Sequence, residues 1–388
     1  MGGGRVRKVC LISDMTKPYF GGMESHAREF FNHFISDDPN NRFFVMFPKG
    51  GEISELALSS NSNVSKIPFS STSDFAEFAR FCPAEKDAIF FFNSIYWVRV
   101  FADLRKASPN AKIVLRSGGN DILQAQLLDV SPTHCVRQSF VVSAINEYVD
   151  VLVVNSQYSF DRFVSLGINP LKMKIVAGGV DLERFCPISA AKKSELREML
   201  GILPDAKVIL SAARFVPFKR VDFTLRLFSS LSDPTLVLLL SGDGPEYENL
   251  KPLIEADSRV RYLGATGFDQ MPNLYGASDL YLQNPIYYEA SVPGGKYIHT
   301  ETMGRTFCEA AACAIPSICT NVGGVAQIID PNTGILIDGL DQVRFAREIS
   351  SLIADESRRL LIGINARKKA VEQLGFDTVF ATYQRDVF

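Results

Sequence analysis

The chain has 388 residues, more than one hydrophobic core usually covers, so we expect two domains. Hydrophobic residues make up 46% and charged residues 22% of the sequence, a balance typical of globular proteins. The formal net charge of −2 argues against a nucleic acid as the main partner, because a surface that follows phosphates needs a basic excess.

The seven cysteines lack the paired spacing of a metal site or a disulfide framework, so we expect buried thiols in a reducing compartment. Residues 1–7 are rich in glycine and arginine and do not read as a secretory signal. The most apolar stretches, 88–92 and 236–240, are too short to span a bilayer. These features predict a cytoplasmic protein. Weak peripheral contact with a membrane stays open, although no strongly basic amphipathic helix supports it.

The first half of the chain alternates short apolar runs with segments of helical period, which is typical of βαβ units around a parallel sheet. The first strand is expected at 8–13, before a Gly21–Gly22 turn and a helix over 24–35. Ser156 is expected to cap a later helix. The other strands of this series are expected at residues 43–47, 88–92, 112–116, 151–154 and 174–176.

A second alternating series follows a segment, 177–187, that is rich in glycine at one end and bounded by proline, as suits a hinge. Its strands are expected at residues 207–212, 235–240, 260–262, 280–283, 315–320 and 335–337. The final stretch, 376–388, is amphipathic. The sequence therefore predicts an α/β protein with two Rossmann-like, doubly wound domains that face a central cleft.

Two features suit a diphosphate. The Gly21–Gly22 turn lies between a strand and a helix, where the backbone can approach phosphate closely. Arg214 and Lys219 follow the first strand of the second series, at the edge of the sheet where ligands of such folds bind. Each feature alone also fits an ordinary turn or a solvated loop.

The densest cluster of polar residues is ETMGRTFCE, which runs from Glu301 to Glu309 into an apolar helix. A turn with glycine before a helix exposes backbone N–H groups, and the two carboxylates can accept hydrogen bonds from hydroxyl pairs of a sugar and a ribose. The alternative without a ligand is that Glu301 is an exposed acid and that Glu309 forms a local salt bridge.

In order and together, these segments resemble the large family 4 of glycosyltransferases, retaining enzymes of the GT-B fold. The resemblance covers nearly the whole chain and includes the stretches VDVLVVNSQYSFDRF, KIVAGGVDLERFCP, ARFVPFKRVD, LSGDGPEYENL and ETMGRTFCEAAACAIPSICTNVGG. It implies an acceptor-binding domain over 1–186 and a donor-binding domain over 187–370. A C-terminal segment over 371–388 should carry a helix that crosses back to the first domain.

The resemblance also implies roles for individual residues. Glu301 should hold hydroxyls of the donor sugar, and Arg214 and Lys219 should neutralise the diphosphate; these three are the candidate catalytic residues. Glu309 should bind the ribose. The other candidate donor-binding residues are Gly22 near the diphosphate, Gly304, Arg305 and Thr306 through their backbone N–H groups, and Leu263 near the base. Such enzymes need no metal and no cofactor beyond the nucleotide sugar.

The chain departs from the family where many relatives carry a histidine that touches the donor sugar. Here Ser117 occupies that position, in RSGGND, and Asn120 and Asp121 are candidates for sugar or acceptor contacts. Residues of this kind in a glycine-rich loop are also common structural turn formers. His26 and His299 keep a candidate role on the acceptor side because they lie beside the Gly21–Gly22 turn and Glu301.

The resemblance as a whole implies a retaining glycosyltransferase that moves a glucosyl or N-acetylglucosaminyl group from a UDP-sugar to an acceptor hydroxyl. A weaker similarity, in SGGND and TETMGR, points to a small aminocyclitol such as 2-deoxystreptamine as the acceptor, with a glycan as the other class. Two alternatives stay open. One is a GT-B epimerase of nucleotide sugars, and the other is a catalytically silent sugar-nucleotide-binding protein.

Overall fold

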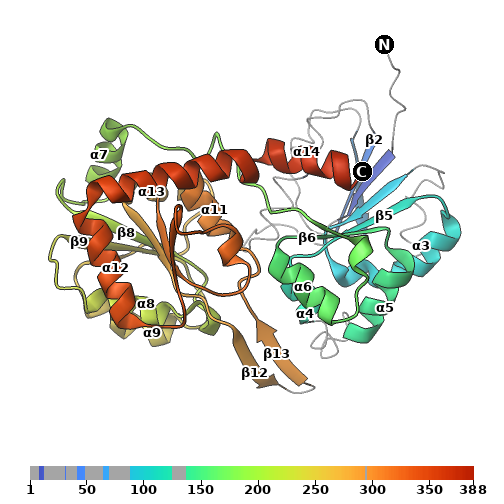
Figure 1. Cartoon of the computed structure of the whole chain (residues 1–388), viewed down its shortest axis with the longest axis horizontal. Coiled ribbons are helices and arrows are strands. Elements are labelled where there is room, and N and C mark those ends of the chain that lie inside the picture. The colour runs from blue at the N-terminus through green and yellow to red at the C-terminus, as the bar shows by residue number, and fades with distance from the viewer. Residues whose placement is uncertain are drawn as a thin grey trace, which may run out of the picture. The chain divides into compact units, whose positions relative to one another are not determined.

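The computed structural model describes residues 8–12, 31, 42–48, 64–69, 88–124, 137–292 and 295–388. The chain forms two compact units (Figure 1). Unit 1 comprises Met1–Gly179, Glu289–Ile298 and Phe376–Phe388, and unit 2 comprises Val180–Tyr288 and His299–Gly375. The chain passes from unit 1 to unit 2 within the segment 177–187, which the sequence marks as a hinge.

Unit 1 is built on a parallel sheet of seven strands in the order β3-β2-β1-β4-β5-β6-β7. The strands are β1 (Lys8–Ile12), β2 (Arg42–Pro48), β3 (Val64–Phe69), β4 (Ile89–Phe92), β5 (Lys112–Arg116), β6 (Val151–Val154) and β7 (Met173–Ile175). All of them match expected strands except β3, which the sequence analysis missed. Its proline, Pro68, is tolerated because β3 is an edge strand.

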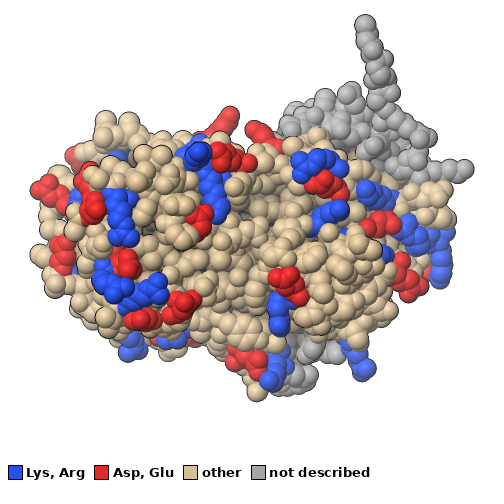
Figure 2. Space-filling view, viewed as in Figure 1, with Lys and Arg blue, Asp and Glu red and all other residues tan. Residues whose placement is uncertain are grey.

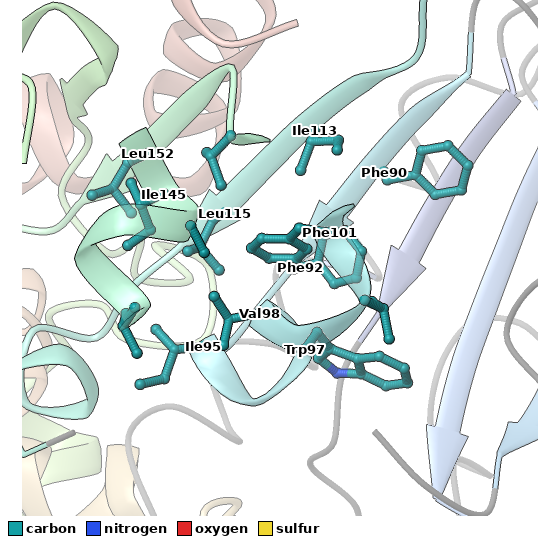
Figure 3. Packing of buried hydrophobic residues seen from close by; sticks show 14 of the residues in the cluster. Phe90, Phe92, Ile95, Trp97, Val98, Phe101, Ile113, Leu115, Ile145 and Leu152 are labelled. Carbon is teal, nitrogen blue, oxygen red and sulfur yellow. The ribbon is translucent and has the colours of Figure 1, made fainter. Parts of the chain in front are cut away.

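One face of this sheet is covered by aromatic and aliphatic side chains from the segments that follow β4, β5 and β6. Figure 3 shows Phe92 of β4 beside Phe101, with Trp97 nearby. The ring centroids of Phe92 and Phe101 are 4.9 Å apart, and Trp97 is fully buried. The covering segments are η2 (Ile95–Val100), α3 (Phe101–Ala107), α4 (Asn120–Leu123), α5 (Gln138–Tyr148) and α6 (Gln157–Ser165). Ser156 caps α6 as expected, because its hydroxyl accepts a hydrogen bond from the backbone N–H of Ser159.

The opposite face of the unit 1 sheet is covered by α14 (Phe376–Asp386), which comes from the far end of the chain (Figure 1). Val379, Phe380 and Tyr383 pack in one buried cluster with β-strand residues such as Leu11 and Phe91. The expected return of a C-terminal helix to the first domain is therefore confirmed.

Unit 2 contains a six-stranded parallel sheet in the order β10-β9-β8-β11-β14-β15. This is the doubly wound arrangement, in which the strand order reverses between β8 and β11. The strands are β8 (Lys207–Ala212), β9 (Leu236–Ser241), β10 (Val260–Tyr262), β11 (Leu280–Gln283), β14 (Ser317–Thr320) and β15 (Gly334–Ile337). Each overlaps an expected strand, so the prediction of two parallel α/β sheets is confirmed.

Helices cover both faces of this sheet. α8 (Val221–Ser229), α9 (Tyr247–Glu255) and α12 (Gln342–Ala354) share a buried cluster with Leu280 and Leu282 of β11. Tyr281, between those two leucines, points to the other face, where it meets Tyr275 of α10 (Met271–Ala277) and Phe307 of α11 (Arg305–Ala312). The remaining helices of unit 2 are α7 (Ala190–Met199) and α13 (Glu356–Lys369).

A separate two-stranded sheet joins β12 (Tyr288–Val292) and β13 (Gly295–His299), between β11 and α11 in the chain (Figure 1). These two strands were not expected from the sequence. Lys296 of β13 forms an exposed ion pair with Glu289 of β12, with nitrogen and oxygen 2.5 Å apart.

Among the described residues, no helix combines the length and the apolar character that a membrane span requires. On the face shown in Figure 2, blue basic and red acidic side chains are interspersed, as the small net charge leads one to expect.

Candidate functional site

The candidate site of unit 2 starts from the loops at the carboxyl ends of β8 and β11, on either side of the point where the strand order reverses. After β8 the chain passes Arg214, forms the short helix η5 (Pro217–Lys219) and enters α8. Arg214 is exposed and forms no ion pair with any described residue. Its guanidinium is therefore available to an anion.

Lys219 and Glu301 form a direct ion pair, although they lie 82 positions apart in the sequence. Their side chains are 16% and 17% exposed, so most of each is removed from water. Two groups that the sequence assigns to the same ligand therefore do lie together. In this structure they satisfy each other.

An aromatic stack lies directly beside this ion pair. The rings of Phe218 and His299 are stacked at 3.5 Å between centroids. Phe218 directly precedes Lys219 in the chain, and His299 lies two positions before Glu301. Burial lowers the pKa of His299 to about 4; the Glu301 carboxylate acts in the opposite direction, whereas the charges of Lys219 and Arg214 lower it further. The imidazole is therefore neutral at pH 7. The sequence proposed His299 for the acceptor side but gave no sign of this stack.

The backbone of Glu301 is fixed by the loop that follows β14. The N–H of Gly324 donates a hydrogen bond to the carbonyl oxygen of Glu301 at 2.8 Å. Gly323 has a φ of +58°, and a Cβ at this position would lie 2.1 Å from the same oxygen. Only glycine allows this approach, so Gly323 is a supporting residue that sequence reasoning missed; its signal was the glycine pair of TNVGG.

α11 begins at Arg305 directly after Gly304, which adopts a left-handed conformation with φ of +86° and provides no side-chain cap. The first N–H groups of a helix have no partner within the helix, and they carry its positive dipole end. The expected backbone donors of Gly304, Arg305 and Thr306 thus lie a few residues from Glu301, at an end of α11 that suits an anion.

Glu309 lies one turn into α11 and is buried. Its carboxylate accepts hydrogen bonds from the Nε of Arg305 at 3.1 Å and from the hydroxyl of Tyr275 at 3.0 Å. Burial raises the pKa of Glu309, and the Arg305 charge and the Tyr275 hydrogen bond partly offset this effect. The local salt bridge is present, and the expected ribose contact stays a prediction. Tyr275 was not among the sequence candidates.

Leu263, the candidate near the base, follows β10 and is half-buried. Its N–H donates to the carbonyl of Leu240 at 2.9 Å, and the carbonyl of the next residue, Gly264, accepts from the N–H of Gly242 at 2.8 Å. The two loops that end β9 and β10 are therefore tied together at the same edge of the sheet as the loop of Arg214.

The candidates of unit 1 lie at the carboxyl end of β5. Ser117 is buried, its hydroxyl donates to a carboxylate oxygen of Asp121 at 2.5 Å, and it accepts from the N–H of Gly119 at 3.0 Å. Burial raises the pKa of Asp121, and the Ser117 hydrogen bond opposes this. Asn120 begins α4. These bonds shape the loop itself, and ligand contacts by the three residues stay predictions.

Gly22 and His26 lie outside the described residues. Within the described part of the chain, no group of three His, Cys, Asp or Glu side chains could hold a metal ion. The described cysteines Cys10, Cys186, Cys308, Cys313 and Cys319 carry free thiols.

Residues 192–369 match the family model of the glycosyl transferases group 1. Over 93% of its length the chain is 26% identical to the GDP-mannose-dependent monoacylated alpha-(1-6)-phosphatidylinositol monomannoside mannosyltransferase of Corynebacterium glutamicum, of which it covers 92%. A D-inositol 3-phosphate glycosyltransferase of Salinispora tropica is 30% identical over 57% of this chain and 47% of that relative.

The fold is also that of solved glycosyltransferases. Anabaena HepE in complex with UDP aligns over 98% of both chains with a TM-score of 0.77 at 20% identity. A glycosyltransferase of Rickettsia africae aligns over 98% of this chain and 97% of its own with a TM-score of 0.75 at 17% identity. Residues 192–369 are therefore similar to the group 1 glycosyltransferases, and the two doubly wound sheets give the chain the GT-B fold.

Proposed function

We propose that this protein transfers a hexosyl group from a nucleoside diphosphate sugar to an acceptor hydroxyl with retention of anomeric configuration. Unit 2 binds the donor and unit 1 the acceptor. The observation that carries the proposal is the meeting of Lys219 with Glu301 beside the start of α11. A cation, a carboxylate that could accept hydrogen bonds from hydroxyls, and the first N–H groups of α11 thus lie close together, which supports a donor site there.

Each of these groups has a task in the proposed reaction. Arg214, Lys219 and the N–H groups of Gly304, Arg305 and Thr306 bind the diphosphate and stabilise the charge that grows on it as it leaves. Glu301 accepts hydrogen bonds from hydroxyls of the donor sugar, and Glu309 accepts them from the ribose. Because cationic side chains neutralise the leaving group, the proposed reaction requires no metal.

Retention follows from attack on the face that the leaving group occupies. The acceptor oxygen bonds to the anomeric carbon while the bond from that carbon to the phosphate oxygen breaks. The departing phosphate oxygen takes the acceptor proton, so no enzymatic nucleophile is needed. Neither carboxylate is placed as a free nucleophile, which is consistent with this route. Glu301 is paired with Lys219, and Glu309 accepts hydrogen bonds from Tyr275 and Arg305.

The sequence favours a UDP-hexose as the donor. GDP-mannose is the second candidate. The mannosyltransferase of Corynebacterium glutamicum, which this chain matches along most of its length, is named as dependent on GDP-mannose. The acceptor proposed from the sequence is an aminocyclitol or a glycan. The relatives' names add a phosphatidylinositol mannoside or an inositol phosphate. The cytoplasmic location stays a prediction.

The donor can be tested by titration calorimetry with UDP, GDP and their glucose, N-acetylglucosamine and mannose conjugates, because a ligand of the folded state also raises its stability. Glu309→Gln should weaken free nucleotide and sugar nucleotide alike, by roughly 1–3 kcal/mol for a lost hydrogen bond to a charged group. A Glu309→Gln variant that binds every nucleotide as tightly as the wild type would remove Glu309 from the donor site.

Three further measurements test this proposal against its rivals. Incubation with the donor alone yields an epimerised nucleotide sugar if the protein is an epimerase. With acceptor present, the anomeric configuration of the product, read by NMR, shows retention or inversion. Turnover that Glu301→Gln abolishes, while the protein stays folded, rules out a silent binding protein; the absence of turnover with any donor and acceptor pair supports it.

A further inference from the structure

The Lys219–Glu301 ion pair joins two side chains that the proposed function gives to different parts of the donor. Lys219 is assigned to the diphosphate, and Glu301 to the sugar. In this structure neither charge is free to bind a ligand, because each side chain is paired with the other. Binding of the donor therefore has to replace an existing interaction.

Burial makes it unfavourable to break this ion pair when only one of its two members gains a new partner. Both side chains are more than four-fifths buried, so a member that loses its partner keeps a desolvated charge. His299, stacked on Phe218 at 3.5 Å, is neutral at pH 7 and brings no charge that could take over either role. Arg214 is exposed and unpaired among the described residues, so a phosphate reaches it without such a cost.

We propose that donor binding exchanges the Lys219–Glu301 ion pair for contacts with the ligand, and that this exchange makes the site discriminate between the sugar nucleotide and the free nucleoside diphosphate. The inference rests on the proposed function. An intact donor offers the diphosphate to Lys219 and sugar hydroxyls to Glu301, so both buried charges regain partners. A free nucleoside diphosphate takes Lys219 and leaves Glu301 without one.

The exchange bears on the end of the reaction as well. Once the sugar has moved to the acceptor, the nucleoside diphosphate that remains competes with Glu301 for Lys219. Re-formation of the ion pair then favours release of this product. Glu301 is thus a specificity-determining residue that acts against the product as well as for the donor.

The test is calorimetric titration of wild type and Glu301→Gln with UDP and GDP, and with the sugar nucleotides that bind. Glutamine keeps the shape and removes the charge. We expect Glu301→Gln to bind the free nucleoside diphosphate about 5- to 10-fold more tightly, as expected when a buried competitor for Lys219 is removed. The same variant should bind the sugar nucleotide more weakly, so the two affinities move in opposite directions.

The matched control is Glu289→Gln, which removes the same charge from the exposed Lys296–Glu289 pair and should change neither affinity. A double-mutant cycle adds a second check. In a Lys219→Met background, Glu301→Gln should no longer tighten nucleotide binding, because the group that it releases is absent. Glu301→Asp, which keeps the charge, replaces Glu301→Gln if the latter does not fold, and should retain most of the discrimination.

The outcomes separate this inference from the function on which it rests. If Lys219→Met leaves binding of every nucleotide unchanged, Lys219 does not contact the diphosphate, and both fail. If Lys219→Met weakens nucleotide binding but Glu301→Gln does not tighten it, only the exchange is overturned. Equal tightening of both ligands in Glu301→Gln also overturns it, because a general gain in positive potential then explains the result.

Discussion

At the scale of single residues, burial beside charged groups alters the chemistry of His299. Its imidazole is stacked on Phe218 and lies near Glu301, Lys219 and Arg214, and burial lowers its pKa to about 4. In the unfolded chain the pKa of histidine is about 6.5. Between these two values the unfolded chain binds more protons than the folded protein, so stability rises with pH across this window and falls as the solution is acidified.

We predict that His299→Phe removes this dependence while it keeps the stack. In the wild type, His299 alone should account for a loss of about 3 kcal/mol in the free energy of unfolding between pH 6.5 and pH 4. Urea unfolding at a series of pH values measures the effect. Wild-type and His299→Phe profiles that stay parallel through the window would show that His299 is protonated normally in the folded protein.

The sequence named most partners of the site but not their pairings. Lys219 was a candidate because it follows the first strand of the second series, and Glu301 because it begins the polar cluster that runs into an apolar helix. Their direct ion pair depends on how two loops 82 positions apart are folded, and no local pattern encodes this. Tyr275 and Gly323 were missed for the same reason, since their importance comes from what they touch in space.

At the scale of elements, a buried ion triad fixes α7 to the sheet of unit 2. Asp279, just before β11, accepts hydrogen bonds from Lys193 at 2.8 Å, from Arg197 at 2.7 Å and from the N–H of Val208 at 2.8 Å. Burial alone would raise the pKa of Asp279, but the two cations hold it below its usual value. Its contribution to stability is therefore present at neutral pH and is lost as the pH falls below about 4.

We predict that Asp279→Asn destabilises unit 2 by about 3–5 kcal/mol, because it leaves Arg197 buried and Lys193 half-buried without their anion. Glu195→Gln is a suitable control, since it removes one partner of the exposed Lys192–Glu195 pair of the same helix and should cost about 1 kcal/mol or less. Thermal or urea unfolding followed by a probe in unit 2 measures both. Similar losses in the two variants would contradict a special role for the triad.

Elements with a strong apolar run were predictable, and those without one were not. β5, β6, β8 and β11 have the bounds that their apolar runs predict, because strands buried on both faces carry little else. β3 has the sequence VSKIPF at a sheet edge, and β12 alternates exposed and half-buried residues. Strands of this kind are stabilised by their neighbours in the fold more than by their own composition.

At the scale of the whole molecule, the chain crosses between its units more than once. Unit 1 begins the chain and is completed by α14, whose side chains share a buried cluster with β1 and β4. The T-shaped contact of Tyr383 with Phe91, at 5.9 Å between ring centroids, joins residues from opposite ends of the sequence. Unit 1 therefore depends on a segment that follows unit 2 in the chain.

We predict that Phe380→Ala destabilises unit 1 by about 3–5 kcal/mol, the usual cost of truncating a buried aromatic side chain, and leaves unit 2 unchanged. Gln384→Ala, on the exposed side of the same helix, should have little effect. Hydrogen exchange resolved by peptide distinguishes the two units. Faster exchange in β8 and β11 as well as in β4 and β5 would show that the units unfold together.

The place of α14 in the chain also affects how the protein folds as it is made. A ribosome synthesises every residue of unit 2 before it reaches α14, so the nascent chain carries the unit 1 sheet before α14 can pack on it. During this interval Leu11, Phe91 and their neighbours have no helix from α14 to cover them. Transiently exposed apolar surface of this kind is what chaperones bind and what leads to aggregation. Unit 2, by contrast, can assemble its sheet as soon as β15 has emerged.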